Sequence, residues 1–527
     1  MTSDSLPGSL SVLAQSLIDK FETKEALDAD KKISVNGLVS KVAYWYEKVR
    51  TAMDYGSEET LLRRAIERIL KRRLVLDPNS KTLAEILVRE LIWANYFPDE
   101  TVPESIINKV ANTIHLYLAL KKGLETTRAL PNGKIYELII ELLSCEIDVI
   151  LLPNKEKEAM TNFMFHVLKN SVEIVDDSPQ VRDAQIFIAI RKNFARDDIA
   201  FLRYKLFIQI FGKLTEENLD ATIASFSNGY REIEYQLSYP RKDRVFNQVK
   251  KKTPPFLILY DVFMESRGHL KEVANDSEKL KAQVFAACEK RYASISRKVR
   301  TAIIRSFVFI LFTKAFIAIS IEGTFERIFF GHIQWFSIAL NIIVPPTLML
   351  IIPLSIKTPK VDNSERILSD IQRLLFEEEP QIIRPLQIKL KSNSVKTIRD
   401  YIFSISWLLT FFLTFGLVLL ILNKLSFNIL SQGIFLFFIA IVSFLTYRIY
   451  QTANTYNMPA RQSLTAPLMD FFFVPIIRVG QRFTEGIAQI NFILIIIDFI
   501  IEAPFKGLVG FFEQWFMFLS IKREELE

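Results

Sequence analysis

Four long apolar segments in the C-terminal part of the chain limit most strongly what it can fold into. They are Ile303–Ile321, Trp335–Leu354, Ile402–Leu422 and Phe427–Tyr447. Each has about the 20 apolar residues that an α-helix needs to cross the hydrocarbon core of a bilayer. A packed soluble helix would carry a polar stripe, and these segments carry almost none. The sequence therefore predicts four transmembrane helices in a multi-pass integral membrane protein.

Basic residues around these segments predict their orientation. Lys and Arg are frequent before the first segment, between the second and the third, and after the fourth. The connection between the first two contains only Arg327, and that between the last two only Lys424. Because Lys and Arg accumulate in cytoplasmic loops, we expect four crossings with both termini in the cytoplasm. The general character of the chain favours the cytoplasmic membrane of a bacterial cell.

Charge and hydrophobicity are segregated along the chain. Hydrophobic residues make up 50% of the 527 residues and charged residues 24%, so a uniform globular protein is not expected. Residues 1–33 are polar and acidic, without the basic and apolar regions of a signal peptide, and we expect a flexible or partly helical segment. Residues 34–300 show apolar positions at helical spacing, interrupted by Pro, Asn and Gly. They predict an all-helical cytoplasmic domain without a sheet.

Helical periodicity locates individual helices in this domain. In the first predicted helix, apolar residues recur at helical spacing from Leu61 to Leu70. The other predicted helices are Lys81–Tyr96, Pro103–Lys121, Ile135–Leu152, Lys155–Val175, Pro179–Phe194, Ile199–Phe211 and Glu272–Ser296. The apolar run Leu138–Leu152 contains three acidic residues and is shorter than a span. We expect it to form a buried core helix.

The C-terminal part is predicted to alternate between membrane and cytoplasmic segments. It comprises a first transmembrane pair at 301–356, a cytoplasmic helical hairpin at 357–400, a second pair at 401–448 and interfacial amphipathic helices at 449–527. The apolar face that begins at Phe505 is typical of a helix lying in the headgroup plane. A fifth crossing at Ile487–Ile501 is the alternative, although Asp498 interrupts that run.

Lys314 is the candidate functional residue of the first span. It lies about 16 Å along a helix that rises 1.5 Å per residue, which is near the bilayer centre. An ammonium group there costs about 3 kcal/mol, so it must face protein or water. Glu322, Glu326 and Asp498 are its candidate partners. A contact for an ion, proton or substrate is one interpretation; a structural ion pair or a snorkelling side chain is the favoured one.

Three polar or helix-breaking residues interrupt the second span. They are Asn341, Pro345 and Pro346. Adjacent prolines free backbone carbonyls, as in the broken helices of transporters, although a simple kink is the commoner result.

A basic cluster directly precedes the first span, and its members are Lys290, Arg291, Arg297, Lys298, Arg300 and Arg305. These cations are candidate contacts for anionic lipids, although a topology signal alone is the favoured interpretation, because the orientation rule already accounts for them. A second basic face runs from Arg63 to Arg73. It lacks interleaved aromatic residues and a known binding module, so nucleic acid is not an expected partner.

No catalytic motif is recognisable in the chain. The cysteines Cys145 and Cys288 and the four histidines are too scattered for a zinc site, and we expect no metal or cofactor. The leading hypothesis is therefore a non-enzymatic, membrane-anchored scaffold that recruits an unknown protein partner at the cytoplasmic face. The alternative is a transporter or channel that uses Lys314 and the interrupted second span. An enzyme acting on lipids is the third and weakest hypothesis.

Overall fold

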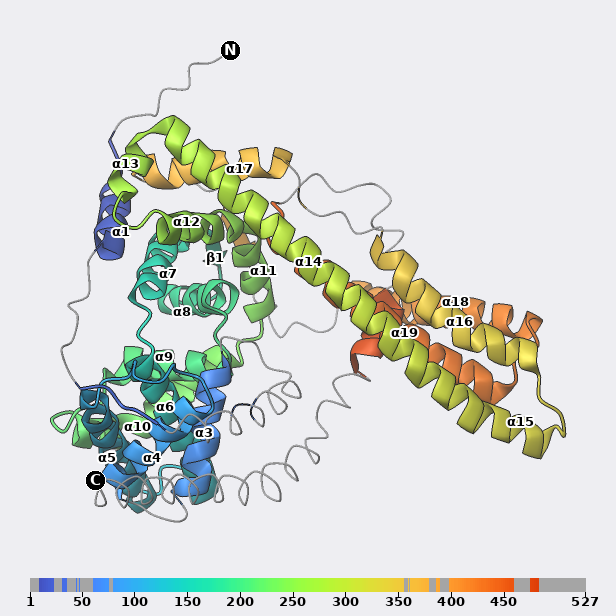
Figure 1. Cartoon of the computed structure of the whole chain (residues 1–527), viewed down its shortest axis with the longest axis horizontal. Coiled ribbons are helices and arrows are strands. Elements are labelled where there is room, and N and C mark those ends of the chain that lie inside the picture. The colour runs from blue at the N-terminus through green and yellow to red at the C-terminus, as the bar shows by residue number, and fades with distance from the viewer. Residues whose placement is uncertain are drawn as a thin grey trace, which may run out of the picture. The chain divides into compact units, whose positions relative to one another are not determined.

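The computed structural model describes residues 9–22, 31–35, 44, 47, 60–74, 79–354, 359, 361–378, 385–388, 398–458 and 474–482. Within these residues the fold is helical, apart from two three-residue strands and one isolated bridge (Figure 1). This confirms the all-α class. By internal contacts the chain divides into two units. The N-terminal unit includes Val12–Lys250 and Glu378–Leu390, and the C-terminal unit includes Lys251–Glu377 and Lys391–Ile490.

The N-terminal unit is a layered set of helices around α6. Its elements are α1 (Val12–Glu22), α3 (Leu61–Arg73), α4 (Ser80–Trp93), α5 (Ser105–Thr126), α6 (Asn132–Leu151), α7 (Lys155–Leu168), α8 (Pro179–Ile190), η2 (Arg191–Ala195), α9 (Ile199–Phe211), α10 (Leu219–Leu237) and α11 (Lys242–Lys252). Helix α6 packs against α3, α5 and α9, and most of its side chains are buried. The prediction of a core helix here is confirmed.

Polar caps explain where several of these helices begin. Asn79 accepts a hydrogen bond from the Lys81 amide at the start of α4, and Asn154 accepts one from Lys157 at the start of α7. Ser178 caps α8, which has Pro179 in its first turn. Such caps satisfy amide groups that have no partner inside the helix.

A short parallel sheet was not predicted. The expected helix Lys155–Val175 ends at Leu168, and strand β1 (Val172–Ile174) pairs with β2 (Leu386–Ile388). Within the register, Val172 lies opposite Leu386 and Ile174 opposite Ile388. The prediction was wrong because the partner strand lies more than two hundred positions away along the chain, so local periodicity carries no sign of it.

The C-terminal unit contains the apolar helices together with α12, α13 and α17. Its elements are α12 (Pro254–Glu265), α13 (Leu270–Asn275), α14 (Ser277–Ile317), η3 (Ala318–Gly323), α15 (Thr324–Phe329), α16 (Trp335–Leu354), α17 (Val361–Phe376), α18 (Ile398–Lys424) and α19 (Ile429–Ala453). Helix α14 packs on α12 and α17, and also on α16 and α19 (Figure 1). Ile367, Ile371 and Leu374 of α17 are buried, as their spacing predicts.

One continuous helix contacts both sets of neighbours, α12 and α17 on the one hand and α16 and α19 on the other. It runs from Ser277 to Phe329 over 53 residues, whereas the sequence predicted a helix ending at Ser296 and a separate span beginning at Ile303. The prediction was wrong because neither Pro nor Gly occurs between Ser277 and Gly323 to end the helix. At 1.5 Å per residue the helix is roughly 80 Å long.

Within the residues that the structure describes, three helices are long and apolar enough to cross a membrane. They are Ser277–Phe329, Ile405–Lys424 and Ile429–Ala453. At the fourth predicted span, Trp335–Ile351 is a shorter apolar helix. This helix is the first part of α16, which continues as helix to Leu354 over 20 residues.

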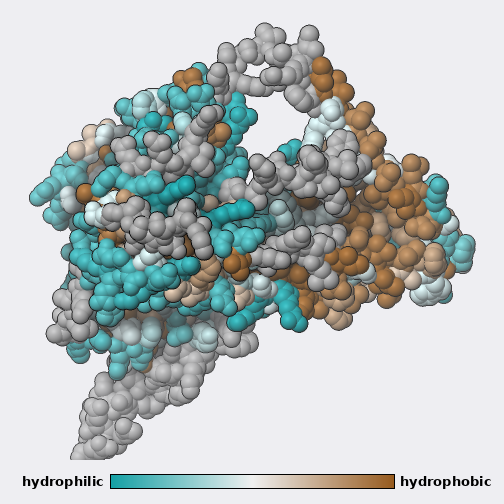
Figure 2. Space-filling view, turned by 90° about the horizontal axis from the view of Figure 1, so that it is seen from above, coloured by the Kyte–Doolittle hydropathy of each residue, from teal (hydrophilic) through white to brown (hydrophobic). Residues whose placement is uncertain are grey.

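Large apolar side chains cover the outside of these helices (Figure 2). Phe312 and Phe316 on α14 and Phe412 on α18 are each at least 70% exposed. Contiguous apolar surface of this kind is rare on a soluble monomer and is typical of a surface that faces lipid.

Most of the predicted interfacial region, 449–527, lies outside the described residues. Residues 474–482 are helical. A Cβ atom added to Gly480 would lie 1.9 Å from the Ala440 carbonyl oxygen, so this segment packs directly on α19. The alternative fifth crossing at 487–501 also lies outside the described part.

Candidate functional site

A fully buried ion pair lies among the apolar helices. Lys314 on α14 and Glu322 in η3 are both 0% exposed, and the Lys314 Nζ atom is 3.1 Å from Glu322 Oε1. The ammonium group also lies over the ring of Phe438 on α19, 4.7 Å from its centroid. Of the three carboxylates considered from the sequence, Glu322 is therefore the partner of Lys314.

The π-helical segment η3 explains why these two residues meet. In a regular α-helix, positions seven apart lie on the same face. A π-type turn contains one additional residue, so the position eight residues after Lys314 takes the place that the seventh would have. Glu322 thereby points to the same side of the helix as Lys314. Such turns occur frequently at functional sites.

Asn341 extends the pair to two further helices. Its Nδ2 atom, on α16, lies 2.5 Å from Glu322 Oε2 and 3.4 Å from the backbone oxygen of Ser431 on α19. Within the described part of the chain, Asn341 Oδ1 and Ser431 Oγ are buried without a hydrogen-bond partner. Two unused acceptors beside a charged pair are suitable ligands for an ordered water.

Glu326 forms a second buried contact at the end of the same helices. Its carboxylate accepts hydrogen bonds from the Gln334 amide and from Asn428 Nδ2, each at 2.7 Å. Asn428 also accepts a bond from the Ser431 amide and so caps α19. Polar contacts therefore continue from Lys314 to the connections that follow α15 and precede α19. We refer to Lys314, Glu322, Asn341, Ser431, Asn428 and Glu326 as the polar cluster.

The prolines of the second span do not interrupt it. Helix α16 runs through Pro345 and Pro346, both of which are buried. Proline provides no amide hydrogen, so the carbonyl groups of Asn341 and Ile342 lose their usual donors four residues on. Of the two alternatives considered from the sequence, a helix that continues through the prolines is the one observed, and a broken helix is not. Asp498, the remaining candidate, lies outside the described residues.

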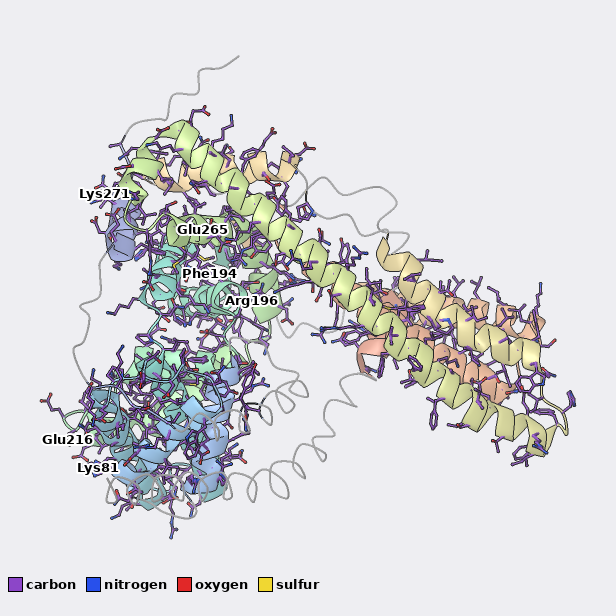
Figure 3. The ribbon with its side chains drawn as sticks, in the orientation of Figure 1. Lys81, Phe194, Arg196, Glu216, Glu265 and Lys271 are labelled. Carbon is purple, nitrogen blue, oxygen red and sulfur yellow. The ribbon has the colours of Figure 1, made fainter. Side chains whose placement is uncertain are left out.

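The basic cluster before the first span divides into two groups. Glu265, which is labelled in Figure 3, lies at the end of α12 and forms an ion pair with Lys290. The guanidinium group of Arg291 donates hydrogen bonds to both carboxylate oxygens of Asp261, each at 2.5 Å. These two cations therefore bind α14 to α12. The remaining four are exposed on α14, and they are Arg297, Lys298, Arg300 and Arg305.

The basic face of α3 is largely occupied by contacts within the N-terminal unit. Arg63 is 5% exposed and binds Glu67 and Asp198. Arg72 and Arg73 both bind the buried carboxylate of Glu90. These cations stabilise the packing of the helices.

Two buried groups of α6 have altered acidities. Burial raises the pKa of Asp148 from 3.8 to about 7, and nearby Asp198 and Asp197 act in the same direction against the opposing charge of Arg63. Burial also raises the pKa of the Cys145 thiol well above its usual value. A thiol that stays protonated is a poor nucleophile, so Cys145 has the character of a core residue.

The polar cluster can bind the three helices together, and its Lys–Glu pair could also exchange a proton or accompany an ion. No group of three or more His, Cys, Asp or Glu residues suited to a metal occurs within the described ranges. Asn428 and Ser431 were not foreseen, although Asn428 directly before an apolar run is a typical N-cap.

No protein-family model matches the chain, and neither a curated protein nor a solved structure matches it.

Proposed function

We propose that the protein is a membrane-anchored platform that presents a helical domain at the cytoplasmic face and recruits protein partners there. The continuous helix Ser277–Phe329 is the observation that supports this proposal most strongly. Its first half packs on α12 and α17, and its apolar half packs on α16 and α19. The helix therefore connects the two sets directly, without an intervening loop.

The proposed topology has four crossings with both termini in the cytoplasm. Helix α16, with 20 residues, has the length of about 30 Å that a crossing of the hydrocarbon core needs. The exposed cations Arg297, Lys298, Arg300 and Arg305 then lie near the cytoplasmic headgroups, where each contributes about 1 kcal/mol of attraction to anionic lipid. The proposed interfacial helices of the C-terminal region would lie along the same face.

A transporter or channel is the second candidate function, and the polar cluster favours it. Charged residues inside a membrane commonly mark a pathway for ions or protons. The Lys314–Glu322 pair is buried where three helices meet, and unused oxygen acceptors lie beside it. The contacts also reach Glu326 at the ends of the helices.

Reconstitution into liposomes separates the two functions. We expect wild-type protein to give no flux of H⁺, Na⁺, K⁺ or Cl⁻ above that of empty liposomes, measured with ion-sensitive dyes under imposed gradients. Lys314→Ala is compared with Thr313→Ala, which changes the adjacent residue on the same helix. Flux that is abolished by Lys314→Ala in protein that remains folded, and that is retained in Thr313→Ala, would exclude the platform and establish the transporter.

A further inference from the structure

A half-open cavity of about 300 Å³ lies between the η3–α15 segment and the start of α16. It is lined by Ile319, Gly323, Thr324, Arg327, Ile328, Ile333, Trp335 and Ile338. Its rim includes Ile319, Ile328 and Trp335, each more than 60% exposed. The volume is at the lower end of the range for small-molecule sites and suits part of one lipid chain. We refer to this cavity as the groove.

Polarity along the groove changes from the helix ends inward. Arg327 lies near the end of α15, and Ile319 lies eight residues before it, roughly 12 Å deeper at 1.5 Å per residue. On the opposite wall, Trp335 is the first residue of α16 and Ile338 lies about one turn further along. Trp at a helix end is typical of the membrane interface. The groove therefore has a polar outer end and an aliphatic inner end.

The positive charge of Arg327 is available at the outer end. Its neighbour Glu326 is 1% exposed, and its two oxygens accept hydrogen bonds from Gln334 and Asn428. Arg327 is exposed and forms no ion pair with any residue that the structure describes. A guanidinium group binds phosphate oxygens with two parallel hydrogen bonds, which makes Arg the preferred cation for phosphodiesters.

Gly323 keeps the inner part of the groove open. A Cβ atom at this position would meet no atom closer than the Ala318 carbonyl oxygen at 3.7 Å and Ile338 Cδ1 at 4.0 Å. A methyl group at this position would therefore make only ordinary van der Waals contacts. A substitution here fills the groove without displacing the backbone.

We propose that the groove binds one membrane phospholipid, with its phosphodiester on Arg327 and an acyl chain along Gly323, Ile319 and Ile338. The polarity gradient, the available cation and the surrounding lipid-facing surface all match such a ligand. Anionic phosphatidylglycerol fits best, because its headgroup carries no cation of its own to compete with Arg327. The proposal does not depend on whether the protein is a platform or a transporter.

Native mass spectrometry of the full-length protein in detergent tests this site, with 1-palmitoyl-2-oleoyl-phosphatidylglycerol as the probe. We expect the wild-type protein to retain one bound molecule of this lipid. Arg327→Gln should weaken this binding roughly tenfold, the loss expected for one charge-assisted hydrogen bond. Lys424→Gln removes an exposed cation from the other short connection and should leave it unchanged.

Two further measurements keep the result interpretable. Gly323→Leu fills the groove and should reduce retention of phosphatidylglycerol and phosphatidylcholine alike, while buried Cys288 stays protected from thiol reagents in a folded variant. Inorganic phosphate at millimolar concentration should fail to displace the lipid, because it lacks the acyl chain. Equal lipid retention by wild type, Arg327→Gln and folded Gly323→Leu would overturn the proposal, as would full displacement by phosphate.

Discussion

Lys314→Ala is expected to destabilise the C-terminal unit by about 3–5 kcal/mol, the loss typical when one member of a buried ion pair is removed. The carboxylate of Glu322 would remain at 0% exposure without the ammonium group that now lies 3.1 Å from its Oε1 atom. Unfolding in detergent can be followed at Cys288, which is buried in α14 and lies in the C-terminal unit. Its modification by a thiol reagent should begin at lower temperature in the variant.

A double substitution distinguishes the charge effect from the loss of packing. Lys314→Met/Glu322→Gln removes both charges and keeps a side-chain amide beside Asn341, so it should recover most of the lost stability. Thr313→Ala, which removes only a hydroxyl bonded to its own helix, should change the stability by less than about 0.5–1 kcal/mol. Equal destabilisation by Lys314→Ala and the double variant would show that the ion pair contributes nothing specific.

Asp148→Asn is expected to stabilise the N-terminal unit, and to do so more strongly at pH 8 than at pH 5. The pKa of Asp148 is raised from 3.8 to about 7 in the folded chain by burial. In the wild type, the unfolded carboxyl ionises near pH 4 and the folded one near pH 7. Stability is therefore present in full below about pH 4 and is lost as the pH rises to about 7. Asn stays neutral throughout and avoids this loss.

The difference between variant and wild type should be roughly 2–3 kcal/mol larger at pH 8 than at pH 5, at about 1.4 kcal/mol per pKa unit. Urea unfolding of the full chain, followed at buried Cys145 on the same helix with a reagent active at both pH values, measures it. Glu137→Gln, which neutralises an exposed carboxyl of α6, should change stability by less than about 0.5 kcal/mol at either pH. A difference independent of pH would contradict the account of Asp148.

Local periodicity located many helices and some of their ends. The predicted helix Ile199–Phe211 coincides with α9, which begins after the Asp198 cap and ends at Gly212 with φ of 79°. The residues that determine both ends, Asp198 and Gly212, are directly adjacent to the helix in the sequence. The pairing of Lys314 with Glu322 was among the predicted possibilities for the same reason, because both residues belong to one helical stretch.

Contacts between distant segments could not be predicted. Glu326 binds Asn428, which is 102 residues away, and Asn341 contacts Ser431, which is 90 residues away. Nothing in the local spacing of either residue identifies its partner. The helices α10, α11 and α12 were also missed. Pro254 lies in the first turn of α12, where proline is tolerated, so a proline there accompanies the start of a helix.

Cysteine accessibility at the two short connections tests the proposed membrane topology most directly. Both native cysteines are buried, so His332→Cys, Lys424→Cys and Lys281→Cys can each be introduced into the full chain and treated with a membrane-impermeant maleimide in intact cells. Four crossings with the helical domain in the cytoplasm predict labelling of His332→Cys and Lys424→Cys, and labelling of Lys281→Cys only after permeabilisation. Protection of Lys424→Cys while His332→Cys reacts would show that α16 does not cross. Labelling of Lys281→Cys in intact cells would place the helical domain outside and contradict the account.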